Sequence, residues 1–279
     1  MSENDENSVL QISSMDNRPL KINTIKSNMS SRIPEKVVKL SRKIEARDPV
    51  DFSFIKEAVA GAGISANEFE NHSSFSHPPD QSYGRILLHE SRRLKIFLMC
   101  WTPGDFTAIH DHGSTDWGGV VALGDFTHRV YRFEDGLLRL RSNSPFGEGQ
   151  VACLTGDLIH MMGNTGNKNI MSLHIYGSDS GNGSLAKKSR VYLPESRKVI
   201  TTNGPAFLNC PREAIIREEA FSAICKHALD DYLDLLKLRL KISTRTGNRQ
   251  QDAGQRNTGQ TSIGQHKNGS SNSRHLNKV

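Results

Sequence analysis

Two histidines one residue apart stand beside a carboxylate in the stretch AIHDHGSTDW, residues 108–117. If this stretch is a strand, successive side chains alternate between its faces, so His110 and His112 point the same way and Asp111 points away. Two imidazoles on one face could form half of a metal site. A lone His-x-His pair is weak evidence, because a histidine on a strand is more often an ordinary polar residue.

A second motif strengthens the metal interpretation. Gly104 lies six residues before His110, and the later stretch TGDLIHMMGN contains His160, followed four residues on by Asn164. Together with Gly124, these spacings resemble the double motif of the cupin barrel, whose two halves place a third histidine opposite the first two. This resemblance predicts a metal site made by His110, His112 and His160.

The carboxylate that accompanies three histidines in most cupin sites is missing. Its position falls on Trp117, and the strand alternation turns the neighbouring Asp116 away from the histidines. A neutral three-histidine site leaves about half of the positions of an octahedral iron open. Open positions suit a substrate that binds the metal itself, such as an anionic thiolate.

The chain resembles the cysteine dioxygenase family and its bacterial thiol dioxygenase relatives over about residues 83–177. The resemblance is carried by the segments YGR (83–85), LMCWTPGDFTAIHDH (98–112), LIHMMGN (158–164) and SLHIYG (172–177). It implies that His110, His112 and His160 hold Fe(II), that Arg85 binds the substrate carboxylate, and that His174 and Tyr176 assist catalysis. The implied substrates are cysteine and dioxygen, and the implied product is a sulfinate.

Two features depart from the family pattern, and two further histidines receive no role. Trp117 stands where the animal enzymes carry a cysteine cross-linked to the active-site tyrosine, and its bulk is expected to reshape the pocket. After Tyr176 the chain reads GSDSGNG in place of a proline pair. His89 and His128 lie near arginines on segments expected to be strand surfaces, and no function is assigned to them.

Several alternatives stay open from the sequence. The thiol could be 3-mercaptopropionate or another small thiol carboxylate, and the chain could be a non-catalytic metal-binding cupin. Arg85 could be a surface arginine, and Tyr176 a half-buried core tyrosine. An isomerase or hydrolase usually needs a carboxylate base near its metal, which position 117 does not supply.

The pattern around these residues predicts an all-β cupin, a small β-barrel or jelly roll, with flanking α-helices at both ends. Short apolar segments separated by Gly, Asp, Asn and Pro turns run from Tyr83 to about Thr201. Helical spacing predicts a helix after Pro34 and another from Asp51. A last helix is predicted from Pro211 to about Lys241.

Composition divides the chain into three parts. Residues 1–32 are expected to be disordered, 33–240 to form the domain, and 241–279 to form a disordered basic tail. The tail holds seven Lys or Arg and one acid, so the formal net charge of +6 comes entirely from it. It lacks aromatic residues that could stack on bases. We therefore expect no nucleic-acid or membrane partner, and a cytoplasmic monomer with reduced cysteines, because no signal peptide, membrane span or CxxC pair occurs.

Overall fold

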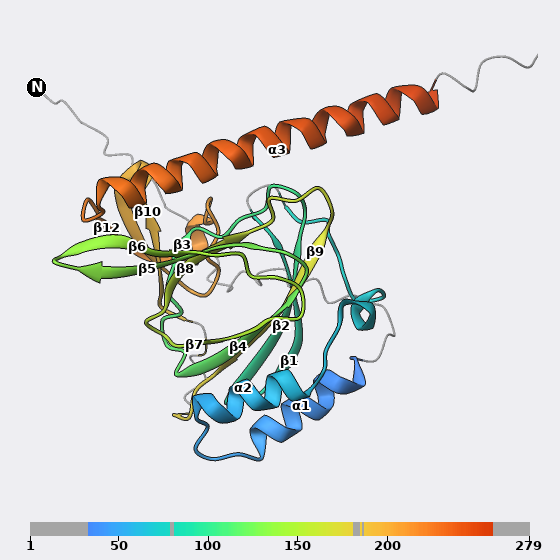
Figure 1. Cartoon of the computed structure of the whole chain (residues 1–279), viewed down its shortest axis with the longest axis vertical. Helices are drawn as coiled ribbons and strands as arrows, with labels where there is room; N and C mark the ends of the chain where they lie inside the picture. The colour runs from blue at the N-terminus through green and yellow to red at the C-terminus, as the bar shows by residue number, and fades with distance from the viewer. Residues whose placement is uncertain (1–32, 79–80, 181–184, 186, 259–279) are drawn as a thin grey trace, which may run out of the picture.

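The protein is described by a computed structural model that covers residues 33–78, 81–180, 185 and 187–258 (Figure 1). Two antiparallel sheets form a jelly roll. Their strands are β1 (Gly84–Glu90), β2 (Leu94–Trp101), β3 (Ile109–His110), β4 (Trp117–Leu123), β5 (Thr127–Glu134), β6 (Leu137–Asn143), β7 (Val151–Leu154), β8 (Ile159–Gly163), β9 (Ile170–Gly177), β10 (Ser189–Leu193), β11 (Lys198–Thr202) and β12 (Ile215–Ala220). One sheet has the strand order β1-β2-β9-β4-β7, and the other the order β12-β11-β10-β3-β8-β5-β6. The predicted all-β cupin with helices at both ends is confirmed.

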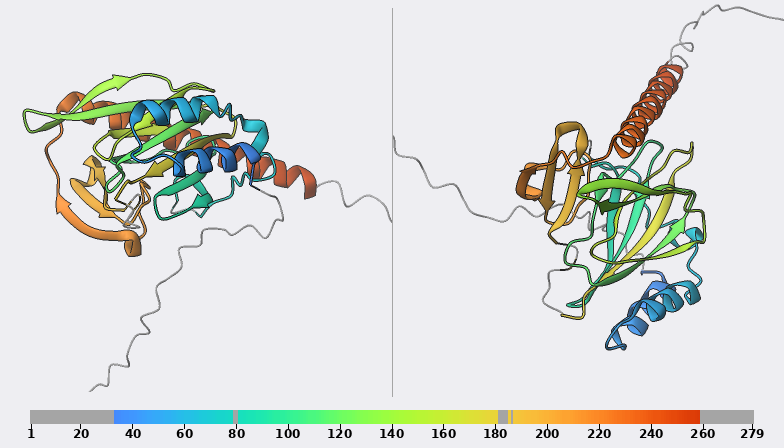
Figure 2. Two further views of the ribbon diagram at one scale, coloured as in Figure 1. Left: turned by 90° about the horizontal axis from the view of Figure 1, so that it is seen from below. Right: turned by 60° about the vertical axis from the view of Figure 1, so that its left-hand side comes forward.

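The two N-terminal helices begin where the sequence predicts. Helix α1 (Glu35–Glu45) follows Pro34, and α2 (Phe52–Gly61) is capped by Asp51, whose carboxylate accepts the Phe54 N–H at 2.8 Å. Their apolar sides pack on the outer face of the five-stranded sheet, where they share a core with β2, β4 and β9. Figures 1 and 2 show both helices on the side of the molecule away from the C-terminal helix α3 (Lys226–Thr258).

A second core fills the space between the sheets. It contains Met99 and Trp101 from β2, Val120 and Ala122 from β4, and Tyr176 from β9. These residues alternate along each strand with residues that face α1 and α2. The alternation therefore decides which side chains can reach a site inside the jelly roll.

The predicted C-terminal helix begins later than expected. Pro211 precedes a short 3-10 turn, η3 (Arg212–Ala214), and residues 215–220 form the edge strand β12 instead of a helix. Glu and Ala favour helices in isolation, but pairing of β12 with β11 outweighs that local preference. Helix α3 covers Lys226–Thr258, so it also continues past Lys241.

Helix α3 closes the outer face of the seven-stranded sheet. Ala228, Tyr232 and Leu235 are buried there, and the Tyr232 hydroxyl donates to the Glu195 carboxylate at 2.8 Å. Residues 1–32 and 259–279 lie outside the described part of the chain, which leaves the predicted N-terminal segment and the end of the basic tail as predictions. None of the described helices combines the length and the apolar character needed to cross a membrane. All four cysteines are free thiols, as their spacing predicts.

Candidate metal centre

The structure brings His110, His112 and His160 together inside the jelly roll. His110 on β3 lies directly opposite His160 on β8 in the antiparallel pair, and His112 follows just after β3. One ring nitrogen from each lies within 4.8 Å of the others, and all three side chains are buried. Asp111 points away, as the alternation predicts, and its carboxylate accepts the Arg190 Nε–H at 2.6 Å.

The chemistry of these imidazoles suits a bound metal. Burial lowers the pKa of all three rings, and the neighbouring histidines lower it further for His112 and His160. They are therefore neutral at ordinary pH, the form that ligates metals. Both ring nitrogens of His112 are buried and make no well-formed hydrogen bond among the described residues, although the Thr155 and Leu158 carbonyls lie near enough to oppose part of the lowering of its pKa. A metal would satisfy such an orphaned nitrogen, so the residues present fit a metal ion.

Arg85 faces the same interior as the histidines. On the sheet it pairs with Met99, which pairs in turn with Ser172, so the three form one row on the inner face. The half-buried guanidinium lies 4.7 Å from the centre of the Phe97 ring, and its Nε has no partner among the described residues. Arg85 is thus not an exposed surface arginine.

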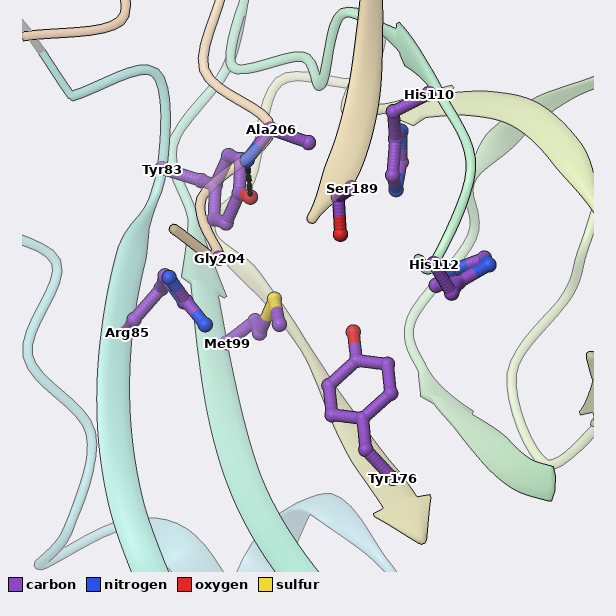
Figure 3. A pocket seen from close by; sticks show the side chains of 9 residues that line it. All are labelled: Tyr83, Arg85, Met99, His110, His112, Tyr176, Ser189, Gly204 and Ala206. Carbon is purple, nitrogen blue, oxygen red and sulfur yellow. Dashed lines mark hydrogen bonds between the residues drawn. The ribbon is translucent and has the colours of Figure 1, made fainter. Parts of the chain in front are cut away.

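These groups border a single pocket, shown in Figure 3. The described residues that line it are Tyr83, Arg85, Met99, His110, His112, Tyr176, Ser189, Gly204 and Ala206. The Tyr176 and Ser189 hydroxyls point into it from opposite sides, and Arg85 lies across it from the histidines. The pocket therefore offers a cation, hydroxyl groups and a metal site to one small molecule.

A chain of buried polar contacts leads to Tyr176. The indole N–H of Trp101 donates to Ser172 Oγ at 3.0 Å, Ser172 Oγ lies 2.8 Å from His174 Nε2, and His174 Nδ1 lies 3.0 Å from the Tyr176 hydroxyl. Burial lowers the pKa of His174 to about 3 and raises that of Tyr176. The sequence interpretation includes His174 and Tyr176 but omits Ser172, although the spacing Ser-x-His-x-Tyr puts all three on one strand face.

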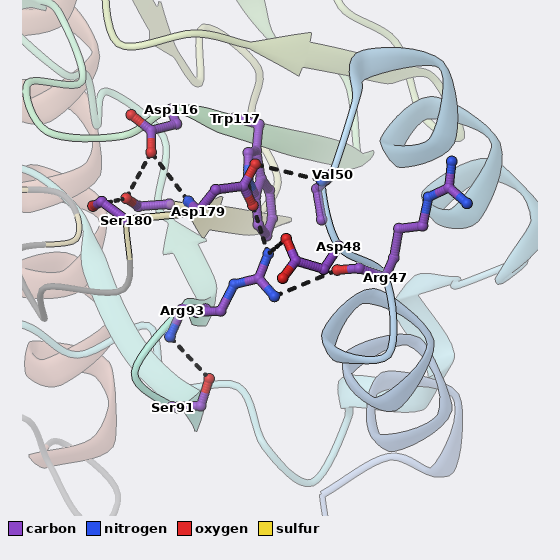
Figure 4. A network of polar contacts seen from close by, with 10 residues as sticks. Arg47, Asp48, Val50, Ser91, Arg93, Asp116, Trp117, Asp179 and Ser180 are labelled. Atoms are coloured by element: carbon purple, nitrogen blue, oxygen red, sulfur yellow. Dashed lines mark hydrogen bonds and ion pairs between the residues drawn. The ribbon is translucent and has the colours of Figure 1, made fainter.

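Trp117 does not border the pocket, so the expectation that its bulk reshapes the pocket is wrong. On β4 it pairs with Gly177 and packs in the core under α1 and α2, while Gly118 pairs with Tyr176. The Trp117 indole donates to Asp179 at 3.0 Å, and Arg93 donates to the same carboxylate at 2.6 Å (Figure 4). The position opposite the candidate catalytic tyrosine is therefore a glycine.

Asp116 also lies outside the metal cluster, as the sequence predicts. Its carboxylate accepts hydrogen bonds from Ser178 Oγ at 2.6 Å and from the Asp179 N–H at 3.1 Å. It is exposed, and these contacts fix the start of the connection after β9. No carboxylate belongs to the three-histidine group in the described part of the chain.

His128 is placed differently from the sequence interpretation. Instead of lying on an outer surface, it faces inward from β5, and its Nε2 lies 2.9 Å from Nδ1 of His160. The arginine that follows it suggests an exposed strand surface, yet Arg129 is the residue that faces out, to Asp231. His89 contacts Glu45 on α1, away from the site.

Fold and site together define a cupin with a candidate three-histidine metal centre. A model of the cysteine dioxygenase type I family matches residues 23–179. This is more than half of the 279 residues, and the chain belongs to that family. The matched stretch contains every candidate site residue predicted from the sequence, but not the pocket residues Ser189, Gly204 and Ala206.

Solved structures similar to this chain include a cupin and a protein with a double-stranded β-helix domain. The TT1209 protein from Thermus thermophilus is 17% identical with a TM-score of 0.32, covering 39% of this chain and 92% of that one. An RmlC-like cupin protein from Desulfovibrio desulfuricans is 20% identical with a TM-score of 0.30, covering 38% and 91%. A double-stranded β-helix protein from Klebsiella pneumoniae is 14% identical with a TM-score of 0.29, covering 38% and 86%.

Proposed function

We propose that the protein is an Fe(II)-dependent thiol dioxygenase that converts cysteine to its sulfinate. The observation that carries this proposal is that Arg85, Tyr176, His110 and His112 border one pocket, and that His160 completes a buried three-histidine cluster beside it, in a member of the cysteine dioxygenase family. Fe(II) held by His110, His112 and His160 would supply the redox chemistry that allows dioxygen to react with a thiolate. Both oxygen atoms go to sulfur, so RSH and O2 give RSO2H and no external reductant is consumed.

Arg85 is the group suited to hold the substrate carboxylate. Its planar guanidinium can donate two parallel hydrogen bonds to a carboxylate, and a charge-assisted pair of this kind gives both energy and orientation. The Phe97 ring beneath the guanidinium limits its movement. With the carboxylate held at Arg85, the thiol of a short substrate would extend toward the histidines across the pocket.

The hydrogen bonds of β9 suggest how Tyr176 presents its proton. Because the Trp101 indole donates to Ser172 Oγ, the Ser172 hydroxyl is free to donate to His174 Nε2. Neutral His174 then carries its hydrogen on Nδ1 and donates it to the Tyr176 oxygen. This order leaves the Tyr176 O–H directed into the pocket as a donor to substrate or oxygen.

One feature of the pocket supports a second candidate substrate, 3-mercaptopropionate. None of its described lining residues is an acid, so a free ammonium group would find no opposite charge there. Cysteine would therefore have to bind with its amine unprotonated, whereas 3-mercaptopropionate needs only the Arg85 contact. We keep 3-mercaptopropionate as the alternative substrate.

Oxygen consumption by the iron-loaded protein tests the proposal. Metal-free protein is loaded with Fe(II) without oxygen and then mixed with aerated cysteine, 3-mercaptopropionate or cysteamine. We expect oxygen uptake with a thiol carboxylate and a product that has gained two oxygen atoms by mass spectrometry. If iron binds but none of the thiols causes oxygen uptake, the chain is a non-catalytic metal-binding cupin and the proposal is wrong.

A further inference from the structure

The three candidate ligands differ in the hydrogen-bond partner of the ring nitrogen that faces away from the metal position. Nδ1 of His110 lies 2.9 Å from the Ala108 carbonyl, which can only accept a hydrogen bond. Nδ1 of His160 lies 2.9 Å from a second imidazole, Nε2 of His128. For His112 the outward contacts are to the backbone carbonyls of Thr155 and Leu158, and neither is a well-formed hydrogen bond. His160 is thus the one ligand whose outer partner, within the described residues, is a titratable side chain.

The strand register explains how His128 reaches this position. Val130 on β5 lies opposite His160 on β8, and His128 lies opposite Met162 two residues away. Residues two apart on a strand share a face, so His128 and His160 are diagonal neighbours on the inner face of the sheet. Their rings meet nearly edge to face, with centroids 5.2 Å apart and planes inclined at 73°. This geometry lets one ring nitrogen point at the other.

The donor and acceptor roles follow from the needs of a metal. With Nδ1 of His160 facing His128, only Nε2 remains to bind the metal, and it must offer a lone pair. The hydrogen of neutral His160 then sits on Nδ1 and is donated to Nε2 of His128, which accepts it. His128 must in turn be neutral and carry its own hydrogen on Nδ1.

We propose that His128 is a positioning residue that fixes His160 in its metal-binding tautomer and ring orientation. An outer partner that accepts the ligand's hydrogen also makes the ligand nitrogen a stronger donor to the metal. The inference rests on the metal site of the proposed function, but not on the identity of the thiol or on reaction with oxygen.

Metal affinity of the native protein and three variants tests this role without any catalytic assay. Metal-free protein is titrated anaerobically with Co(II), and the visible absorption of the bound ion gives both the Kd and a signature of its coordination. His128→Leu removes the acceptor and is expected to raise the Kd by about 10–100-fold. His128→Gln keeps an acceptor oxygen near the position of Nε2 and is expected to stay within about threefold of the native value. His128→Asn is too short to reach His160 and should behave like the leucine variant.

His89→Leu is the matched control, because His89 contacts α1 through Glu45, away from the candidate ligands. Its Kd and Co(II) spectrum should equal those of the native protein. If His128→Leu does not fold by circular dichroism, the comparison of His128→Gln with His128→Asn decides the question. The proposal is overturned if removal of the acceptor leaves the Kd and spectrum unchanged, or if the glutamine variant loses as much affinity as the asparagine variant.

The two proposals can fail separately. A protein that binds Co(II) in a His128-dependent way but consumes no oxygen with any thiol overturns the dioxygenase proposal and supports the role of His128. A protein that consumes oxygen with a thiol, but whose metal affinity does not depend on His128, supports the dioxygenase proposal and overturns the role of His128. Native protein that binds no Co(II) would overturn the role of His128 outright.

Discussion

His160 is the candidate ligand whose removal gives the clearest result at the residue scale, because it comes from β8, whereas His110 and His112 come from β3 and the residues just after it. His160→Ala leaves two imidazoles and, among the described residues, no carboxylate to replace the third. We expect loss of bound iron and of oxygen consumption together, measured by metal analysis after gel filtration. An alanine variant that retained its full iron content would rule out the three-histidine site.

Arg85→Ala tests the carboxylate contact. The carboxylate does not change during oxygen transfer, so the loss should weaken ground-state and transition-state binding alike and appear mainly in KM. Since each charge-assisted hydrogen bond contributes roughly 1.5–3 kcal/mol, KM for the preferred thiol carboxylate should rise by about tenfold to several hundredfold. Steady-state oxygen uptake with native and variant protein gives both constants.

Cysteamine, which has no carboxylate, is the control substrate for that experiment. It should be a poor substrate of the native protein and should lose much less when Arg85 is replaced. Equal losses for the two thiols would mean that Arg85 supports the fold instead of the ligand. A native preference for cysteamine would place the substrate among amine thiols.

The lowered pKa of His174 predicts how the free energy of unfolding depends on pH. Its pKa is about 3 in the folded protein against a usual value of 6.5, because burial disfavours the charged ring. Below about pH 6.5 the unfolded chain takes up a proton that the folded chain refuses, so the free energy of unfolding falls as pH is lowered from there toward pH 3. The limiting slope is about 1.4 kcal/mol per pH unit for one such group.

Urea unfolding of metal-free native protein and His174→Gln at several pH values measures this contribution. The glutamine cannot titrate, so the stability of the variant should decrease less steeply between pH 6.5 and the folded pKa than that of the native protein. Parallel curves for the two proteins would show that His174 is not held neutral in the native state.

The residues that can be predicted from the sequence are those whose spacing carries information. Alternation places His110 and His112 on one face, and the same rule applied to β9 gives His174 and Tyr176 and also reaches Ser172. Ser189 and Ala206 border the pocket from segments far along the chain, and no local pattern indicates that. The face of His128 depends on a pairing between β5 and β8 that a single strand does not reveal.

At the scale of elements, the sequence is least informative where pairing between strands decides the structure. Strands β8 and β10 are only five residues each, too short for their own sequence to mark them clearly, yet β8 lies between β3 and β5, and β10 between β3 and β11. β12 is an edge strand that carries Arg and Glu, a composition that also suits a helix. By contrast, β2 can be recognised from the sequence alone, because its apolar run is long and bounded by polar residues.

The position of Trp117 in the core under α1 and α2 predicts an effect on stability and not on activity. Because the indole faces α1 and α2 and donates to Asp179, Trp117→Phe should cost about 1–2 kcal/mol of unfolding free energy while kcat/KM changes less than about threefold. Tyr176→Phe is the matched opposite: it should keep the stability and reduce kcat by about 100-fold if the hydroxyl donates a proton or hydrogen bond. Denaturant unfolding and oxygen uptake separate the two. A Trp117→Phe protein of native stability with an altered substrate preference would mean that the side chain reaches the pocket after all.

At the scale of the whole molecule, the site is assembled from both sheets and from a late segment. The inner face of β2 and β9 carries Met99 and Tyr176, β3 and β8 carry two of the histidines, and Ser189 and Ala206 close the pocket from the chain after the family match ends. The segment after residue 179 is therefore part of the site, and it leads through β11 and β12 into α3. The question at this scale is how much of α3 and of the basic tail the site needs.

A truncation after Ile242 answers it. The buried contacts of α3 come from Ala228, Tyr232 and Leu235, whereas Leu238 and Leu240 are 39% and 59% exposed. Figure 2 shows the later turns of the helix extending away from the sheets. We therefore expect the shortened protein to fold with an unfolding free energy within about 0.5 kcal/mol of the full chain.

Activity of the truncated protein depends on whether the tail's charge matters. Removing residues 243–279 takes away six Lys or Arg and one Asp, which lowers the formal net charge from +6 to +1. An anionic thiol carboxylate is attracted to a positive protein at low salt, an effect that is screened within about 10 Å at 0.1 M ionic strength. We expect kcat/KM to decrease by less than about tenfold, equivalent to about 1.4 kcal/mol, and the difference to vanish as salt is raised.

Oxygen uptake at low and high salt measures this effect. A truncation after Cys225 is the control that should not fold, because it removes the buried Tyr232 and Leu235. A loss of more than about tenfold that persists at high salt would mean that the removed residues contact the site directly.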